Sequence, residues 1–386
     1  MKLIAHIDLN AFFVQVEELK DPSLKTKFVA VGGNSSRSVV CSANYLARKR
    51  GVHSGMSIKK AKELCPGIVI LDGHYGLYSE YSHRFFDYLR KIFNRIMQTS
   101  IDECYIDITD FTDKEHARDF LRDLQIDLFK DTDLKCSIGC GPNKFLAKMG
   151  SDYQKPMGLT MIFKEDVERI LWPIPIGDMY GIGKKTAPTL ISLGVKTIGD
   201  LANTLDTKVM KILGSMFLYH KQHAMGEGND ELNYEHFDPK SVSAARTFLE
   251  DTSDEEELSN MIIKLSKQVS KELIKYKKTS KCVVVTFRTA DFVTNSKRKQ
   301  FDTYENDAAK IASRALQIFE TYYKYEPLRL IGVGVSDVIN TFDATEQMNI
   351  YMIKKEEKSA VKEEQRKETS DGGYENRFHI LDDEDI

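Results

Sequence analysis

Apolar and polar positions follow two different periods along the first 165 residues of the chain. Short apolar runs predict buried strands, and apolar residues spaced three or four apart predict helices. The expected strands are 3–9, 28–33, 38–43, 100–108 and 134–141, and the expected helices are 11–20, 44–52, 77–98, 117–132 and 143–153. Strand–helix–strand units in this order predict a ferredoxin-like sheet.

The pattern changes after residue 165. Residues 166–231 are typical of helices joined by short turns, and a polar linker follows at 232–241. Residues 242–340 then give the order strand–helix–strand–strand–helix–strand, so we expect an α+β chain of several domains. From Thr341 onwards the residues are mostly charged, which predicts a largely disordered tail.

Composition narrows the class of protein. Of the 386 residues, 41% are hydrophobic and 29% charged, which favours a globular protein. No apolar run is long enough to cross a bilayer, and the N-terminus lacks the features of a signal peptide, so no membrane association is expected. The six cysteines form no CxxC pair, which predicts reduced thiols, no zinc site and a cytoplasmic location.

Charge is distributed unevenly along the chain. The net charge is −3, but residues 341–386 carry six more acidic than basic groups, so residues 1–340 have a net charge of +3. Residues 258–300 contain eleven lysines and arginines and two acids. This segment suits contact with the DNA backbone, and a solvated basic face is the alternative. The candidate DNA contacts here are Lys277, Lys278, Arg288, Lys297, Arg298 and Lys299.

Three carboxylates stand at predicted strand ends. Asp8 closes the first strand, and Asp102 and Glu103 open a later one. If these strands are neighbours, the carboxylates meet at one sheet edge, and nothing basic nearby in sequence neutralises all of them. Mg²⁺ prefers a few carboxylates together with phosphate oxygens, so we predict two Mg²⁺ ions bridging to a triphosphate. A plain cluster of surface carboxylates is the alternative.

Two further segments carry groups that could hold phosphate. Ser42, Tyr45 and Arg48 are spaced to lie on one side of a helical turn, where a guanidinium can make a forked contact. Lys155, in an extended Lys-Pro segment, could reach a phosphate, and Lys144 and Lys148 precede it. A solvated basic helix and ordinary surface lysines are the alternatives.

Residues 179–202 contain glycine turns at the spacing of a helix-hairpin-helix. Glycine allows close approach of the backbone, and helix N-termini present free N–H groups to phosphate. The candidate DNA contacts in this motif are Gly181, Gly183, Lys184 and Lys185. An ordinary helical hairpin is the alternative.

Together these segments resemble the Y-family of DNA polymerases, specifically its bacterial DinB-type members. The resemblance runs from Ile4 to about Val338, and its carriers are HIDLNAFFVQVEE, VVCSANYLARKRGV, SIDECYIDITD, SIGCGPNKFLAKMGSDYQKPMG and YGIGKKTAPTLISLGVKTIGDL. It implies a right-hand polymerase with a ferredoxin-like palm (1–10 and 74–165), small fingers (11–73), a helical thumb with the helix-hairpin-helix (166–231) and a βαββαβ little finger (242–340).

The resemblance also implies roles for single residues. Asp8, Asp102 and Glu103 match the catalytic metal ligands, and the backbone carbonyl of Leu9 would complete the ligands of one ion. Phe13 matches the steric gate that excludes a 2′-hydroxyl. The other positions that match the surroundings of the nucleotide are Phe12, Ser42, Tyr45, Arg48 and Lys155.

The implied activity is translesion DNA synthesis at low fidelity, without proofreading, by a monomer that binds primer–template DNA and deoxynucleoside triphosphates. Asn10 stands where the family often has a second acid. Gln347, Met348, Ile350 and Tyr351 resemble the family's peptide for binding the sliding clamp, although 35 residues follow it.

Two other classes of protein share part of this pattern. A nucleotidyl or diguanylate cyclase also places carboxylates and two metals on a ferredoxin-like sheet, but has no use for a helix-hairpin-helix. A non-catalytic DNA-binding factor descended from a polymerase would have lost a catalytic carboxylate, and all three are present here. Primer extension with Mg²⁺ separates these alternatives.

Overall fold

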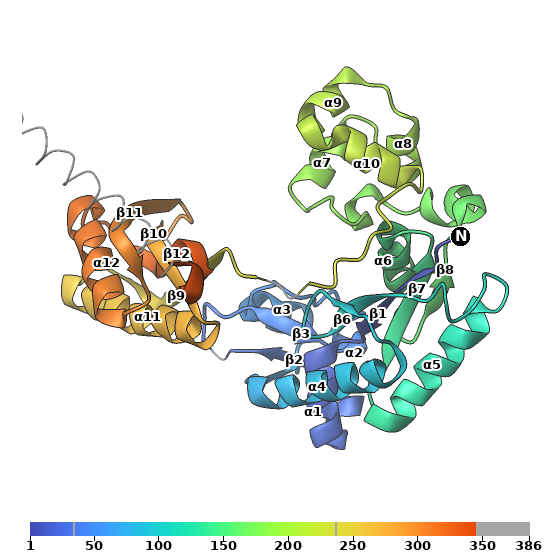
Figure 1. The fold of residues 1–386 in the computed structure, drawn as a ribbon, viewed down its shortest axis with the longest axis horizontal. Helices are drawn as coiled ribbons and strands as arrows, with labels where there is room; N and C mark the ends of the chain where they lie inside the picture. Colours follow the sequence, from blue (N-terminus) through green and yellow to red (C-terminus); the bar gives the residue numbers. More distant parts are fainter. Residues whose placement is uncertain (34, 236–237, 345–386) are drawn as a thin grey trace, which may run out of the picture. The chain divides into compact units, whose positions relative to one another are not determined.

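The computed structural model describes residues 1–33, 35–235 and 238–344 (Figure 1). The chain divides into two compact units, Met1–His236 and Phe237–Ile386. Across the described residues, every helix is too short or too polar to span a lipid bilayer.

A five-stranded sheet organises the first unit. Its order is β5 (Met97–Gln98), β6 (Glu103–Asp107), β1 (Ile4–Leu9), β7 (Cys136–Gly141) and β8 (Leu159–Met161). The central strand β1 is antiparallel to both neighbours, and β7 is parallel to β8. The ends of strands that are far apart in sequence therefore meet beside the end of β1.

Both faces of β1 are covered by helices. Ala5, Ile7 and Leu9 belong to the apolar core that α4 (Tyr75–Ile92) and α5 (Ala117–Thr132) share. Successive side chains of a strand point to opposite faces, so Ile4, His6 and Asp8 lie on the other face, toward α6 (Lys144–Tyr153). Each fully buried aliphatic side chain contributes about 1.5–3 kcal/mol to stability. The buried side chains of β1 therefore fix the position of this strand between the helices.

Two glycines bring α6 close to the sheet. A Cβ atom on Gly139 of β7 would lie 2.0 Å from the carbonyl oxygen of Ala147 and 2.2 Å from the amide nitrogen of Ser151. A Cβ atom on Gly150 of α6 would lie 3.0 Å from the Cα of Gly139. Only glycine fits both positions, so the helix lies directly on the strand.

A smaller sheet in the order β3 (Val40–Ala43), β2 (Val29–Gly32) and β4 (Val69–Leu71) lies within residues 11–73. Its helices are α1 (Phe12–Lys20), α2 (Tyr45–Arg48) and α3 (Ile58–Leu64), with a 3₁₀ turn at Pro22–Thr26. The sequence pattern missed both α3 and β4. Ser42 lies in β3 and not on the helical turn of Tyr45 and Arg48, so the prediction of one helix face was wrong for it.

Residues 164–224 form short helices joined by turns, as predicted, and their apolar core also includes Phe145, Leu146 and Met149 of α6. A π-helical turn at Val167–Leu171 leads to α7 (Thr186–Ser192), α8 (Ile198–Asn203), α9 (Thr207–Leu213) and α10 (Phe217–Ala224). Short 3₁₀ turns lie at Lys164–Asp166, Ile176–Asp178 and Gly214–Met216.

The second unit has the predicted order of elements. They are β9 (Ser241–Thr252), α11 (Glu255–Lys275), β10 (Lys278–Thr289), β11 (Thr294–Glu305), α12 (Ala308–Tyr322) and β12 (Leu328–Asn340). The strands form one antiparallel sheet in the order β11-β10-β12-β9. Val283, Val285 and Phe287 of β10 face the core shared with both helices, so the helices cover one face of this sheet.

One predicted helix ends earlier than expected. The apolar period predicted a helix at 77–98, but α4 ends at Ile92, and Met97–Gln98 form the edge strand β5. Phe93 is already extended, and Met97 pairs with Tyr105 of β6. Hydrogen bonding to a neighbouring strand therefore overrides the local helical period here.

Candidate active site

The three predicted carboxylates meet at the end of β1. Asp8 is directly opposite Glu103 in the β1–β6 register. Asp102 immediately precedes β6, and its backbone carbonyl accepts a hydrogen bond from the Leu9 amide at 3.0 Å. The expected convergence of Asp8, Asp102 and Glu103 is thus present, and Leu9 lies beside them.

Two lysines offset the charge of these carboxylates, although no basic group close in sequence was expected to neutralise them all. Lys148 on α6 lies 2.8 Å from Glu103 and 3.1 Å from Asp8, measured from its Nζ. Lys155 lies 2.7 Å from Asp8, and both ammonium groups also contact Asp152. Burial alone would lower the pKa of Lys148, but Asp8, Asp152 and Glu103 raise it well above its usual range.

Asp102 is held by its own loop. Ser100 Oγ donates to Asp102 Oδ1 at 2.6 Å, and the Asp102 amide donates to the same hydroxyl at 3.2 Å. Burial raises the pKa of Asp102, and the nearby charges of Asp8 and Glu103 act in the same direction, against the Ser100 hydrogen bond. A positive charge arriving here would favour the ionised carboxylate.

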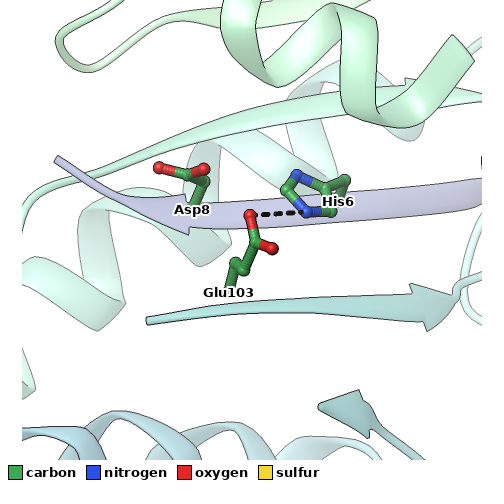
Figure 2. A group of neighbouring side chains, drawn as sticks. All are labelled: His6, Asp8 and Glu103. Carbon is green, nitrogen blue, oxygen red and sulfur yellow. Dashed lines mark ion pairs between the residues drawn. The ribbon is translucent and has the colours of Figure 1, made fainter. Parts of the chain in front are cut away.

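His6 belongs to the same cluster, and the sequence analysis missed it. Its ring is fully buried on β1, with Nδ1 2.8 Å from Ser151 Oγ and Nε2 3.5 Å from Glu103 Oε2 (Figure 2). Burial lowers the pKa of His6. The signal was in the sequence: an imidazole two positions before Asp8 in an apolar strand must lie on the same face as Asp8.

One hollow brings two of the three carboxylates and the predicted nucleotide-binding residues together. Asp8 and Asp102 line it alongside Arg48 and Lys155. Its other lining residues are Leu9, Ala11, Phe12, Phe13, Cys41, Ser42, Tyr45 and Ser54. Residues from β1, α1, β3, α2 and the segment after α6 therefore face one space. It combines two carboxylates with a guanidinium and an ammonium group, and the ammonium group of Lys155 is paired with Asp8.

The basic side of this hollow is built from α2. Arg48 Nε donates to the Ala43 carbonyl at 2.8 Å, and its guanidinium carbon lies 4.9 Å from the centre of the Tyr45 ring. The Tyr45 hydroxyl is buried and has no hydrogen-bond partner among the described residues, and burial raises its pKa. A buried hydroxyl without a partner favours an oxygen of a bound ligand.

Phe13 is fixed by two tyrosines of α4. Its ring stacks on Tyr78 with centres 4.5 Å apart and planes at 13°, and meets the edge of Tyr75 at 5.8 Å. Phe12 is only 2% exposed and belongs to the core, although it also lines the hollow. Of the two phenylalanines, Phe13 is the one whose ring is only partly buried.

The predicted DNA contacts of the helix-hairpin-helix lie together on the surface. Gly181, Gly183, Lys184 and Lys185 are all exposed and precede α7. Gly181 has φ +96°, a backbone conformation that glycine adopts without strain. Lys144, at the start of α6, does not line the hollow.

The basic residues of β10 and β11 point to two different faces. Lys297 lies 5.1 Å from the centre of the Tyr322 ring, and Lys299 bonds to Gln317 at 3.2 Å, so both lie toward α12. Arg298 pairs with Val284 on the opposite, uncovered face, and Arg288 shares that face.

Lys277 and Lys278 differ from each other. Lys277 is exposed, as expected for a DNA contact. Lys278 is only 4% exposed, bonds to Asn340 Oδ1 at 2.7 Å and forms an ion pair with Asp238. The prediction that Lys278 is an available surface lysine was therefore wrong, because its charge is already paired inside the protein. The predicted clamp peptide, Gln347, Met348, Ile350 and Tyr351, lies outside the described residues.

Three family models match the chain in sequence order. Residues 7–152 match the impB/mucB/samB family, residues 164–195 the helix-hairpin-helix motif of that family, and residues 239–350 its C-terminal domain. DNA polymerase IV of Bacillus velezensis is 34% identical over 92% of this chain and 87% of the relative. DNA polymerase IV of Oceanobacillus iheyensis is 36% identical over 93% and 87%. The chain belongs to the Y-family of DNA polymerases.

Solved structures agree with this assignment. A Y-family chimera, Dbh-Dpo4(243-245)-Dbh, matches with a TM-score of 0.77 at 28% identity, covering 88% of this Y-family chain and 99% of the chimera. DinB from Sulfolobus solfataricus matches with a TM-score of 0.59 at 27% identity over the same shares. An insertion ternary complex of Dbh DNA polymerase matches with a TM-score of 0.61 at 27% identity, again over 88% and 99%. The predicted fold class is confirmed, and these matches favour a DNA-directed DNA polymerase over a nucleotidyl cyclase.

Proposed function

We propose that this Y-family polymerase extends a primer 3′-hydroxyl on a DNA template by a two-Mg²⁺ mechanism, at low fidelity, without proofreading and past damaged bases. The observation that carries the proposal is the single hollow in which Asp8 and Asp102 face Arg48 and Lys155. The carboxylates of this hollow suit hard divalent cations, and its cationic side chains suit the triphosphate.

The donor set fits magnesium. Asp8, Asp102 and Glu103 supply hard oxygen ligands, and the Leu9 carbonyl lies at the same strand end. Two Mg²⁺ ions held there would lower the pKa of the primer hydroxyl and offset the charge of the departing pyrophosphate.

The protein's own residues bind and orient the nucleotide. Ser42 and Tyr45 offer hydroxyl groups to phosphate oxygens, while Arg48 and Lys155 offset their charge. Phe13, stacked on Tyr78, presents its ring to the sugar and so excludes a 2′-hydroxyl. Phosphoryl transfer requires mainly positioning and charge neutralisation, so no nucleophilic side chain is needed.

We assign the parts of the hand as follows. The palm comprises 1–10 and 74–165, the fingers 11–73, the thumb 166–231, the linker 232–241 and the little finger 242–340. The linker spans the boundary between the two compact units. We further propose a cytoplasmic monomer that binds DNA through the thumb glycines and the basic residues of the little finger.

Primer extension tests the proposal. The full chain is mixed with a primed template, the four deoxynucleotides and MgCl₂, and extended products are resolved on a gel, with an abasic template as a second substrate. Extension that disappears in Glu103→Ala, while the variant still binds the DNA, supports the assignment. DNA binding without extension by the wild type would identify an accessory factor, and a cyclic dinucleotide formed from GTP alone would identify a cyclase.

The clamp peptide is a separate proposal. We propose that Gln347, Met348, Ile350 and Tyr351 bind the sliding clamp, on the basis of their spacing in the sequence. Extension by the full chain and by a chain ending at residue 344 is compared with and without loaded clamp. We expect equal basal extension and weaker clamp stimulation in the shorter chain; equal stimulation of the two contradicts the proposal.

A further inference from the structure

A buried carboxyl group lies behind Phe13, and the proposed mechanism gives it no role. Glu17 of α1 is only 3% exposed, and burying a carboxyl group is costly unless hydrogen bonds compensate for the lost water. The Tyr78 hydroxyl of α4 donates a hydrogen bond to Glu17 Oε1, and His74 Nδ1 lies 2.8 Å from the same oxygen. The carboxyl group of Glu17 therefore links α1 to the first turn of α4.

The hydrogen bond from Tyr78 fixes the ring of this tyrosine at both ends. Burial raises the pKa of Tyr78, and the hydrogen bond to Glu17 acts in the same direction, so the hydroxyl keeps its proton and acts as the donor. The side chain of Tyr78 is also fully buried. A tyrosine ring has few rotatable bonds, so a ring joined to a helix at one end and to a carboxyl oxygen at the other keeps one orientation.

Phe13 stacks on the ring that Glu17 holds. The centres of the Phe13 and Tyr78 rings are 4.5 Å apart, and their planes differ by 13°. Phe13 and Glu17 are four residues apart on α1, so they lie on the same side of that helix and Tyr78 contacts both. The other aromatic contact of Phe13 with α4 is to Tyr75, which is 59% exposed. Tyr78 is thus the rigid support of Phe13, while Phe13 itself lines the hollow.

We propose that Glu17 is a positioning residue for sugar selection: it holds the Tyr78 hydroxyl, fixes the plane on which Phe13 stacks, and so keeps the Phe13 ring in place against a 2′-hydroxyl. The inference rests on the steric-gate role of Phe13 in the proposed function. An apolar pocket rejects one added hydroxyl group only weakly when its walls can adjust. A ring excludes that group only if the ring cannot move aside, and the bond between Tyr78 and Glu17 supplies this rigidity.

The ratio of kcat/KM for CTP and dCTP, measured with the full chain on an undamaged primed template, tests the proposal. Tyr78→Phe removes one hydroxyl group and keeps the stacked ring, so we expect CTP insertion to rise about 3- to 10-fold relative to dCTP insertion, as the loss of one hydrogen bond predicts. Glu17→Leu should raise the ratio by a similar factor. Glu17→Gln keeps an acceptor oxygen and should stay within about twofold of the wild type.

Matched controls separate this effect from a general loss of stability. Tyr81→Phe removes the hydroxyl of a partly buried tyrosine on the same helix, and Glu80→Gln neutralises an exposed carboxylate there; both should keep the wild-type ratio. Glu17→Leu leaves a buried hydroxyl without its acceptor, which destabilises the fold. Glu17→Leu combined with Tyr78→Phe removes both polar groups, so it avoids this cost and should still raise the ratio.

The same substitutions in a Phe13→Val background separate the inference from the function on which it rests. Tyr78→Phe should change the ratio by less than about twofold there, because its effect acts through the Phe13 ring. A rise as large as in the wild-type background overturns the proposal. A ratio that Phe13→Val raises but Tyr78→Phe and the combined variant leave unchanged also overturns the role of Glu17, and the steric gate stands. A ratio unchanged in all of them, including Phe13→Val, overturns both.

Discussion

The central strands of the two large sheets, β1 and β10, are paired antiparallel on both sides but are covered differently. Helices cover both faces of β1, and its side chains include His6 and Asp8 on the α6 face. Within the described residues of the second unit, helices cover one face of β10, and the opposite face carries Thr286 and Arg288. Polar groups held between layers are positioned and partly dehydrated, whereas those on an open face stay hydrated. The first arrangement suits chemistry and the second suits contact with a charged polymer.

The sharpest test of this comparison removes one charge at the end of β1. Asp102→Asn should lower primer extension by about 10³-fold, because the covered site has no other group to take its place. DNA affinity should change by less than about threefold. Single-turnover extension and a filter-binding titration measure the two, with the exposed Asp110→Asn as control. Near wild-type turnover by Asp102→Asn would show that this carboxylate is not catalytic.

Specificity for the sugar should also depend on the covered region. Phe13→Val removes the ring stacked on Tyr78, so we expect ribonucleotide insertion to rise about 10- to 100-fold relative to deoxynucleotide insertion. The ratio of kcat/KM for dCTP and CTP measures the effect. Phe111→Val, at a phenylalanine that is 45% exposed, is the control. An unchanged ratio in Phe13→Val rules out the steric-gate role.

Substitutions on the open face of the second sheet should have smaller and additive effects on DNA binding. Arg288→Ala and Arg298→Ala should each weaken DNA binding about 3- to 10-fold. Each should also reduce the slope of log affinity against log salt concentration by about one, because one fewer counterion is released. Lys297→Ala and Lys299→Ala change charge equally on the same hairpin, but these side chains lie toward α12 and should have less effect. Binding measured across a salt series distinguishes the pairs; a larger loss from the lysines would place the DNA on the other face.

A buried histidine without a charged partner should make the free energy of unfolding depend on pH. Burial, helped by His220, lowers the pKa of His223 from 6.5 to about 4. The unfolded chain therefore binds the proton first, so stability is present above pH 6.5 and is lost as pH falls toward 4. We expect about 1–2 kcal/mol of lost unfolding free energy between pH 7 and 5 from this residue.

The matched variant is His223→Phe, which keeps an aromatic ring against Phe145 but cannot titrate. Urea unfolding at pH 7 and 5 should show a smaller pH dependence in this variant than in wild type or in the exposed His83→Phe. The same pH dependence in all three would mean that His223 does not contribute to it.

Local pattern was sufficient for the order of the long elements, but not for the short elements or for the exact ends. The alternation of β9 to β12 with α11 and α12 was predicted, because each element is long and strongly periodic. The two- and three-residue strands β4, β5 and β8 were missed or read as helix, since only pairing with a neighbour creates them.

The candidate site was predictable where its residues lie at predicted strand ends, and not where side chains meet only through the packing of the fold. Asp8 and Glu103 were predicted together from their strand ends, and the register places them opposite each other. The contacts of His6 with Ser151 and of Lys148 with Asp8 join residues 145 and 140 positions apart, and no local pattern reports them. The burial of Lys278 was hidden for the same reason, because a run of lysines does not reveal which face each one occupies.

The distance between β7 and α6 depends on two glycines, Gly139 and Gly150, because each has only a hydrogen atom where other residues carry a side chain. A methyl group on Gly139 would have to push aside the backbone of Ala147 and Ser151, and the turn between them carries Lys148. Lifting that turn would withdraw the ammonium group from Asp8 and Glu103 and the serine from His6 in one movement. Two residues with no side chain, Gly139 and Gly150, therefore fix the distance between the charged groups of the site.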